Sequence, residues 1–315
     1  MIEFDSVCRA FNGKAAVKDL SLQVAKGEFC VLLGTSGSGK STTLKMINRL
    51  VEYDSGEIRF AGESIRQLDA RSLRQRMGYA IQSIGLFPHW TVRKNIATVP
   101  VLLGWSGAKI NERITTLLAL LNLDERLLNR YPHQLSGGQQ QRVGVARALA
   151  ADPEVLLMDE PFGALDPVTR GVLQQEMLRI HRLSGRTIVL VTHDIDEALT
   201  LADRIVLMDN GEIVQQGRPV ELLTQPKNDF VRDFFGRSEM GVRLLSLEQV
   251  GNAVRRGEWL AGEPIAAGLT LRDALSQFIA RGTDRLPVID DQEQPLGVLY
   301  FGDLLRQREA LTCAG

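Results

Sequence analysis

A glycine-rich segment over residues 34–41, Gly-Thr-Ser-Gly-Ser-Gly-Lys-Ser, carries the clearest chemistry in this chain. Small residues let successive backbone N–H groups curl around phosphate oxygens, and a following helix points its positive dipole at them. Lys40 is expected to reach the β- and γ-phosphates of a nucleotide, and the Ser41 hydroxyl to bind Mg²⁺. An unliganded glycine-rich turn is the alternative, but an apolar strand before the segment and a helix after it disfavour that interpretation. The predicted phosphate-binding residues are Gly34, Thr35, Ser36, Gly37, Ser38, Gly39, Lys40, Ser41 and Thr42.

Two carboxylates follow directly on a second apolar run, residues 155–158. Delivering two acids at the end of a buried strand is electrostatically costly unless a cation or a proton transfer uses them. Asp159 is therefore predicted to bind Mg²⁺, partly through water, and Glu160 to act as the general base that polarises the attacking water. An acidic helix cap is the alternative, and the phosphate loop argues against it.

A second candidate anion site opens a predicted helix over residues 139–151. A serine and two glycines at a helix N-terminus offer a hydroxyl and free N–H groups to an anion. Because the chain already has one phosphate loop, the economical interpretation is a head-to-tail dimer in which this helix contacts the γ-phosphate held by the partner. An ordinary N-cap at Ser136 is the alternative. The residues of this signature segment are Leu135, Ser136, Gly137, Gly138 and Gln139.

These residues need a scaffold that brings strand ends together. Continuous apolar runs predict buried strands at residues 29–33, 154–159 and 187–192. Helical stretches separate these runs, which indicates an α/β core with a mainly parallel sheet. Shorter β signals in the first thirty residues and at 56–65 predict a smaller antiparallel sheet, and residues 90–130 a helical lobe.

His193 follows the third predicted strand directly. A lone histidine is more often structural than functional. Here it is expected at the same sheet edge as Gly34 and Asp159, because parallel strands end at one edge. That placement makes it a candidate for catalysis.

Composition excludes several classes of protein. The 315 residues carry a net charge of −1, with 44% hydrophobic residues, which provides no general basic field for nucleic acid. Three cysteines are too few and too scattered for a disulfide framework or a zinc site. No signal peptide and no run of eighteen apolar residues is visible, so we expect any work at a membrane to be carried out through a partner.

Taken together, the motifs resemble the ATP-binding subunit of ABC transporters over residues 1–236. The resemblance implies a P-loop ABC ATPase core with an antiparallel β subdomain and a helical lobe over about 83–153. It also implies ATP and Mg²⁺ as cofactors and a homodimer of ATPase subunits. By the same resemblance, His193 contacts the γ-phosphate and positions Glu160, and Gln82 touches Mg²⁺ and relays the nucleotide state. Asp166 lies in a loop that crosses the dimer interface, and Phe11 stacks on adenine, with a core-packing role as its alternative.

A narrower resemblance lies in residues 46–50, 81–92, 98–100 and the tail, which are similar to the ATPases of osmoprotectant importers. It implies uptake of glycine betaine, choline or related quaternary amines, with transmembrane permease subunits as partners. An extracytoplasmic substrate-binding protein takes part indirectly, and no nucleic acid is involved. The expected location is the cytoplasmic face of the inner (plasma) membrane, peripheral through the permease. The alternative is a soluble, non-transport ABC ATPase acting on nucleic acid or ribosomes. The 93 residues between Ser41 and Leu135 hold no sustained heptads of the kind that repair-type members insert, and the chain has one ATPase unit where translation-type members have two.

The tail is expected to form a small α+β unit. Residues 237–262 are predicted to be a linker or truncated segment, and residues 263–315 a single CBS-like domain. That resemblance rests on residues 286–290, 297–299 and Asp303. Such modules normally pair around an adenosine-type ligand or sense ionic strength. Tyr300 stands where they usually carry Ser or Thr, which argues against nucleotide binding and leaves a dimerisation or packing role open.

Overall fold

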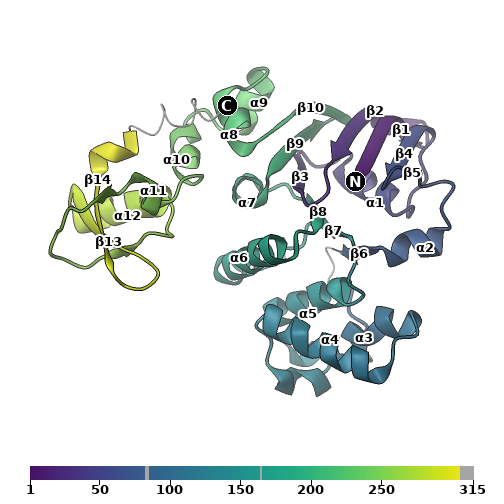
Figure 1. Ribbon diagram of the computed structural model, residues 1–315. Helices are drawn as coiled ribbons and strands as arrows, with labels where there is room; N and C mark the ends of the chain where they lie inside the picture. Colours follow the sequence, from purple (N-terminus) through teal and green to yellow (C-terminus); the bar gives the residue numbers. More distant parts are fainter. Residues whose placement is uncertain (82–84, 164, 306–315) are drawn as a thin grey trace. The chain divides into compact units, whose positions relative to one another are not determined.

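The computed structural model describes residues 1–81, 85–163 and 165–305, and it contains two compact units (Figure 1). The first unit spans Met1–Gln216 and the second begins at Gly217. Within the described residues, no helix has both the length and the apolar character needed to cross a membrane. The sequence predicts that the ATPase domain ends at residue 236, whereas the division into compact units lies between Gln216 and Gly217. The domain boundary at residue 236 stays a prediction.

A six-stranded sheet forms the centre of the first unit, in the order β10-β9-β3-β8-β7-β6. All the described pairings among β3, β6, β7, β8 and β9 are parallel, which confirms the predicted α/β core. The strands β3, β7 and β8 are buried along their whole length, as continuous apolar runs covered on both faces must be. The bounds are β3 Phe29–Gly34, β6 Met77–Ala80, β7 Val155–Asp159, β8 Thr187–Val191, β9 Arg204–Asp209 and β10 Glu212–Gly217.

Helices follow the strands and pack against the sheet, as parallel connections require. Helix α1 contacts β7 and β8, α5 contacts β6, and α7 contacts β3. Helix α1 begins after β3 and α7 after β8, close to the carboxyl ends of these strands, where the predicted chemistry lies. The bounds are α1 Lys40–Ile47, α2 Ala70–Gln75, α5 Gly137–Leu149, α6 Pro167–Ser184 and α7 Ile195–Leu201.

An antiparallel sheet, ordered β2-β1-β4-β5, lies beside the central one. Its strands alternate, so that Ile2 and Phe4 are buried while Asp5 is exposed. The buried face shares one core with β3, β7 and β8 of the central sheet. The bounds are β1 Ile2–Phe11, β2 Lys14–Val24, β4 Ser55–Phe60 and β5 Glu63–Ser64.

The helical lobe consists of α3 Val92–Leu102, α4 Gly107–Leu120 and α5, joined by the short helices η1 Glu125–Asn129 and η2 Pro132–Gln134. Fully buried Asn95 organises its entrance. Its Oδ1 accepts the N–H of Phe87 at 2.8 Å, and its Nδ2 donates to the carbonyl of Trp90 at 3.1 Å. These bonds hold the loop before α3 in one conformation.

The second unit contains a four-stranded sheet, ordered β11-β14-β13-β12, with α12 providing much of its core. The stretch predicted as a linker or truncated segment carries α10, α11 and β11, and β11 pairs with β14. Arg255 of β11 donates to both carboxylate oxygens of Asp303, at 2.8 and 2.9 Å. The bounds are α8 Pro219–Thr224, α9 Asp229–Phe234, α10 Met240–Leu245, α11 Val250–Ala253, β11 Arg255–Arg256, β12 Ile265–Ala266, α12 Leu271–Arg281, β13 Arg285–Ile289, β14 Pro295–Tyr300 and η3 Phe301–Leu305.

We expect Phe29→Ala to lower the free energy of unfolding of the first unit by about 3–5 kcal/mol. Phe29 is fully buried at the start of the central strand β3, and its ring meets His181 edge-on at 5.3 Å. Urea denaturation measures the loss. Phe11→Ala is the control, because that ring is 42% exposed and its removal opens no cavity. Equal midpoints for the two variants would contradict the packing argument.

Candidate functional site

The glycine-rich loop lies between β3 and α1, and its backbone leaves no room for side chains at two positions. Gly34 has φ +149°, and a Cβ there would come within 2.0 Å of the Met208 carbonyl oxygen. Gly39, with φ +98°, would bring a Cβ to 2.4 Å from the carbonyl oxygen of Ala16. The requirement for glycine therefore comes from β9 and β2 as well as from the loop itself.

Lys40 is the central cation of this loop and is only 5% exposed. Its Nζ donates to the carbonyl of Gly34 at 2.9 Å, to that of Thr35 at 2.7 Å and to Ser38 Oγ at 3.2 Å. Burial lowers the pKa of Lys40, while the charges of Glu160 and Asp159 oppose that change. The ammonium group is thus held inside the loop, where it can exchange neutral carbonyl oxygens for anionic phosphate oxygens.

Ser41 and Asp159 form a pair of oxygen groups at the adjacent strand end. Ser41 Oγ donates to Asp159 Oδ1 at 2.7 Å, and Lys45 Nζ lies 3.9 Å from Asp159 Oδ2. The hydroxyl and carboxylate suit Mg²⁺, which binds few protein oxygens and completes its shell with water and phosphate. The described residues contain no group of three or more His, Cys, Asp or Glu side chains able to hold a metal. Gln82, the third predicted ligand, lies outside the described residues.

Glu160 and His193 lie together at the ends of β7 and β8. His193 Nδ1 is 3.3 Å from Glu160 Oε2, although the two residues come from different strand ends. Glu160 has φ +46°, a left-handed conformation that is uncommon outside glycine and is often found at functional sites. Its N–H donates to the Val191 carbonyl at 2.9 Å, which fixes the backbone in that conformation. The hydrogen bond to β8 therefore fixes the direction in which the Glu160 carboxylate leaves the backbone.

The signature segment begins α5, in the helical lobe rather than beside α1 (Figure 1). Ser136 Oγ accepts the N–H of Gln139 at 3.3 Å, and Gln139 Oε1 accepts the N–H of Ser136 at 3.0 Å. Ser136 thus caps its helix, as the alternative interpretation held. A Cβ on Gly137 would meet nothing within 4 Å, so the first turn of α5 is open at that point. The cap leaves space for a further ligand.

Comparison with known proteins identifies the family. A family model described as ABC transporter matches residues 17–163, and one described as CBS domain matches residues 264–309. The chain is 70% identical over 305 residues to the glycine betaine uptake system ATP-binding protein YehX of Escherichia coli (strain K12), covering 97% of this chain and 99% of that protein. The chain belongs to the ABC transporter family.

Further relatives agree with the assignment to the ATP-binding proteins of this family. The glycine betaine/carnitine/choline transport ATP-binding protein OpuCA of Bacillus subtilis (strain 168) is 48% identical, over 100% of this chain and 82% of that protein. Among solved structures, the dimeric bacterial ABC transporter cassette MJ0796 has a TM-score of 0.64 and 34% identity, covering 70% of this chain and 99% of that one. The predicted ABC ATPase fold, the ATPase activity and the CBS domain are confirmed. The roles of individual residues stay predictions.

Asp166 and Phe11, two other residues predicted to take part in the site of this ABC protein, lie at the start of α6 and at the end of β1. Asp166 caps α6 by accepting the N–H of Thr169 at 3.0 Å, and hydrogen bonds from Thr169 lower the pKa of Asp166. Phe11 ends β1 with its ring 42% exposed and the guanidinium of Arg9 4.5 Å from its centroid. The ring is therefore available for stacking, and the core-packing alternative does not describe it.

The helical lobe of the ABC protein carries an apolar groove of about 510 Å³. The rings of Phe87 and Trp90 meet at 4.6 Å, and both remain at least 40% exposed. The other lining residues lie on α3, and the apolar spacing of that helix is the sequence signal that could have indicated them. The lining residues are Phe87, Trp90, Lys94, Ala97, Thr98, Val101 and Leu102.

Arg147 connects this groove to the signature helix. The residue lies in the last turn of α5, and its Nη1 donates to the carbonyl of Gly85 at 2.6 Å. Its guanidinium carbon is 5.8 Å from the centroid of the Phe87 ring. A displacement of α5 would therefore be transmitted through Arg147 to Phe87, which lines the groove.

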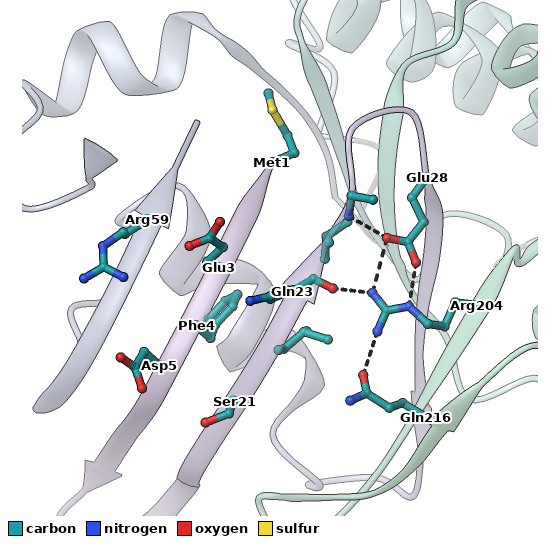
Figure 2. A pocket seen from close by; sticks show the side chains of 13 residues that line it. Met1, Glu3, Phe4, Asp5, Ser21, Gln23, Glu28, Arg59, Arg204 and Gln216 are labelled. Carbon is teal, nitrogen blue, oxygen red and sulfur yellow. Dashed lines mark hydrogen bonds and ion pairs between the residues drawn. The ribbon is translucent and has the colours of Figure 1, made fainter. Parts of the chain in front are cut away.

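A larger cavity of about 740 Å³ lies over the open face of the antiparallel sheet (Figure 2). Its main cation, Arg204, is already bonded to Glu28 at 2.6 Å and to Gln216 at 2.6 Å. Glu3 and Asp5 add negative charge to its floor. This environment disfavours a phosphate ligand, so cavity size does not identify the nucleotide site of this ABC protein.

Proposed function

We propose that this chain is the ATP-hydrolysing subunit of an ABC importer that energises uptake of an osmoprotectant such as glycine betaine or another quaternary amine. The relative from Escherichia coli, named for glycine betaine uptake, supports the substrate class through 70% identity over nearly the whole chain. The observation that carries the catalytic part is the meeting of Lys40, Asp159 and Glu160 with His193 around the ends of β3, β7 and β8.

ATP would lie along the loop at residues 34–42, with Phe11 stacked on adenine. Lys40 and the N–H groups of the loop would bind the β- and γ-phosphates. Ser41, Asp159 and Gln82 would hold Mg²⁺, which would supply positive charge to the phosphates.

Glu160 would accept the proton of the attacking water. Its fixed backbone and the 3.3 Å contact from His193 orient the carboxylate. His193 is 63% exposed in its side chain, so the second ring nitrogen can contact the γ-phosphate. General-base assistance of this kind contributes about 10²–10⁴-fold to a rate.

A head-to-tail homodimer would complete each site. Residues 135–139 of one subunit would contact the γ-phosphate bound by the other, and the Asp166 loop would cross the interface. The dimeric state named for the cassette MJ0796 supports this arrangement. ATP then stabilises the closed dimer, and hydrolysis removes that preference.

The groove at Phe87 and Trp90 would receive a cytoplasmic helix of a transmembrane permease. An apolar helix face laid into a hydrophobic groove is a common mode of recognition. The subunit would thereby be peripheral at the cytoplasmic face of the inner membrane, with an extracytoplasmic substrate-binding protein acting through the permease. Residues 1–236 would form the ATPase domain and residues 263–315 the single CBS-like domain.

Uptake of radiolabelled glycine betaine tests the function as a whole. Cells that carry the permease together with this chain are expected to accumulate the label, and cells with Lys40→Ala are not, because that variant lacks the phosphate-binding cation. Equal uptake would contradict the proposal. Association with ribosomes or nucleic acid instead of membranes would favour the alternative, a soluble non-transport ABC ATPase.

Val101→Glu in the groove is expected to weaken permease binding at least tenfold without changing basal ATPase activity. Burying a new charge in an apolar interface costs several kcal/mol, whereas the residue is 60% exposed in the free subunit. Leu183→Glu is the matched control, since Leu183 is 70% exposed on α6 and does not line the groove. Co-purification with the permease measures binding, and equal recovery of both variants would remove the groove from the interface.

A further inference from the structure

Arg170, in the first turn of α6, is bonded to two separate loops of the site. Its Nη2 donates to the carbonyl of Leu165 at 3.1 Å, next to Asp166. Its Nη1 donates to Asp194 Oδ2 at 3.2 Å, directly after His193. One side chain thus connects the loop predicted to cross the dimer interface with the turn that carries the γ-phosphate contact.

The turn bearing His193 is itself tightly organised around a buried acid. Glu197 is 4% exposed and accepts the hydroxyl of Thr192 at 2.6 Å. Asp194 accepts the N–H of Glu197 at 3.1 Å and donates its own N–H to Thr192 Oγ1 at 3.0 Å. These bonds join Thr192, Asp194 and Glu197 into one network, and Arg170 links that network to α6.

The third guanidinium nitrogen of Arg170 has no hydrogen-bond partner. Nε is buried without a hydrogen-bond partner and lies 4.0 Å from Glu197 Oε1. An unpaired buried N–H is costly and calls for a physical reason. An approach of about 1 Å between the Glu197 turn and the Arg170 side chain would bring Nε within bonding distance of Glu197. The guanidinium can therefore exchange one set of partners for another when a loop moves.

We propose that Arg170 is a positioning residue that couples the two ATP sites of the dimer. Through Leu165 it follows the interface loop, which responds to the partner's nucleotide, and through Asp194 it sets the position of His193 against Glu160. This inference rests on the proposed dimeric ATPase and deepens it. Hydrolysis in one site would then depend on occupancy of the other.

Steady-state ATPase assays of Arg170→Gln test the coupling. We expect kcat to fall about tenfold or more, the Hill coefficient for ATP to fall from above 1 to 1, and ATP affinity to stay within about twofold. Arg170→Lys is expected to recover part of kcat, because an ammonium group reaches one loop but lacks the forked geometry for both. Arg182→Gln, at an exposed arginine of the same helix, is the control and should behave as wild type.

A double variant keeps stability separate from coupling. Removing Arg170 alone leaves Glu197 buried near no guanidinium, which can destabilise the fold. Arg170→Gln combined with Glu197→Gln removes that charge, so we expect a wild-type melting temperature with hydrolysis still slow and non-cooperative. Wild-type kcat and cooperativity in the double variant would overturn the inference and leave Arg170 with charge neutralisation only. If the wild-type protein neither hydrolyses ATP nor dimerises with ATP, the proposed function itself is refuted.

Discussion

Glu160→Gln is expected to lower kcat at least about a hundredfold while ATP still binds. The amide preserves the shape of the side chain and its place beside His193, but it cannot accept the proton of the attacking water. Binding is expected to survive, because the proposed phosphate ligands, Lys40 and the backbone of residues 34–42, are unchanged. Since hydrolysis no longer reopens the dimer, an ATP-bound dimer should accumulate.

Light scattering after size-exclusion chromatography, with and without ATP, measures that dimer, and phosphate release measures kcat. Glu176→Gln is the matched control, because Glu176 pairs with Arg179 at 3.1 Å on α6. The control should hydrolyse ATP at the wild-type rate and remain in exchange between monomer and dimer. Brisk hydrolysis by Glu160→Gln would remove Glu160 as the base.

Mixing two inactive variants is expected to restore ATP hydrolysis if the signature segment acts across the dimer. Lys40→Ala disables the phosphate loop of its own chain. Gly137→Asp places a negative charge at the start of α5, where it repels a γ-phosphate, and Gly137 has open space for a side chain. In the mixed dimer, one site combines the intact loop of the second variant with the intact signature of the first.

Random pairing of the two subunits makes about half of the dimers mixed, each with one complete site. Differently tagged subunits and a pull-down confirm that mixed dimers form. Each variant alone is expected to be inactive, and the mixture active. If each site were built within one chain, every site in the mixture would remain defective. Because the proposed coupling to an empty second site also slows the complete one, ATP-dependent formation of mixed dimers is measured beside hydrolysis. A mixture that neither hydrolyses ATP nor forms more dimer with ATP than each variant alone would refute the trans arrangement.

Local patterns predicted the groups that act within a few residues of each other. The loop at residues 34–41, the cap at Ser136 and the buried runs that became β3, β7 and β8 all depend on contacts along the chain or on continuous burial. Such features are readable because their partners are near in sequence. The short strand β6 and the strand β9, which borders the loop at Gly34, carried weaker signals and were not predicted.

The shape of the groove and the contacts of Arg170 depend on tertiary packing that no local pattern describes. The groove joins Phe87 before α3 to Leu102 at its end, and its depth is set by how α3 packs on its neighbours. In the sequence, nothing distinguishes Arg170 from other arginines on the polar faces of helices. Its partners Leu165 and Asp194 become visible only when α6 lies against the turn after β8.

The sequence by itself determined which chemical groups this ABC protein possesses and that they suit ATP, because glycine spacing, a lysine and paired acids are local properties. The tertiary structure decided where those groups meet. Ser41 and Asp159 are 118 positions apart, yet their oxygens are 2.7 Å apart, because β3, β8 and β7 pair in parallel register and end at one edge. The left-handed backbone of Glu160 and the reach of Arg170 between two loops likewise arise from packing of distant segments, since each is held by residues from another strand or helix.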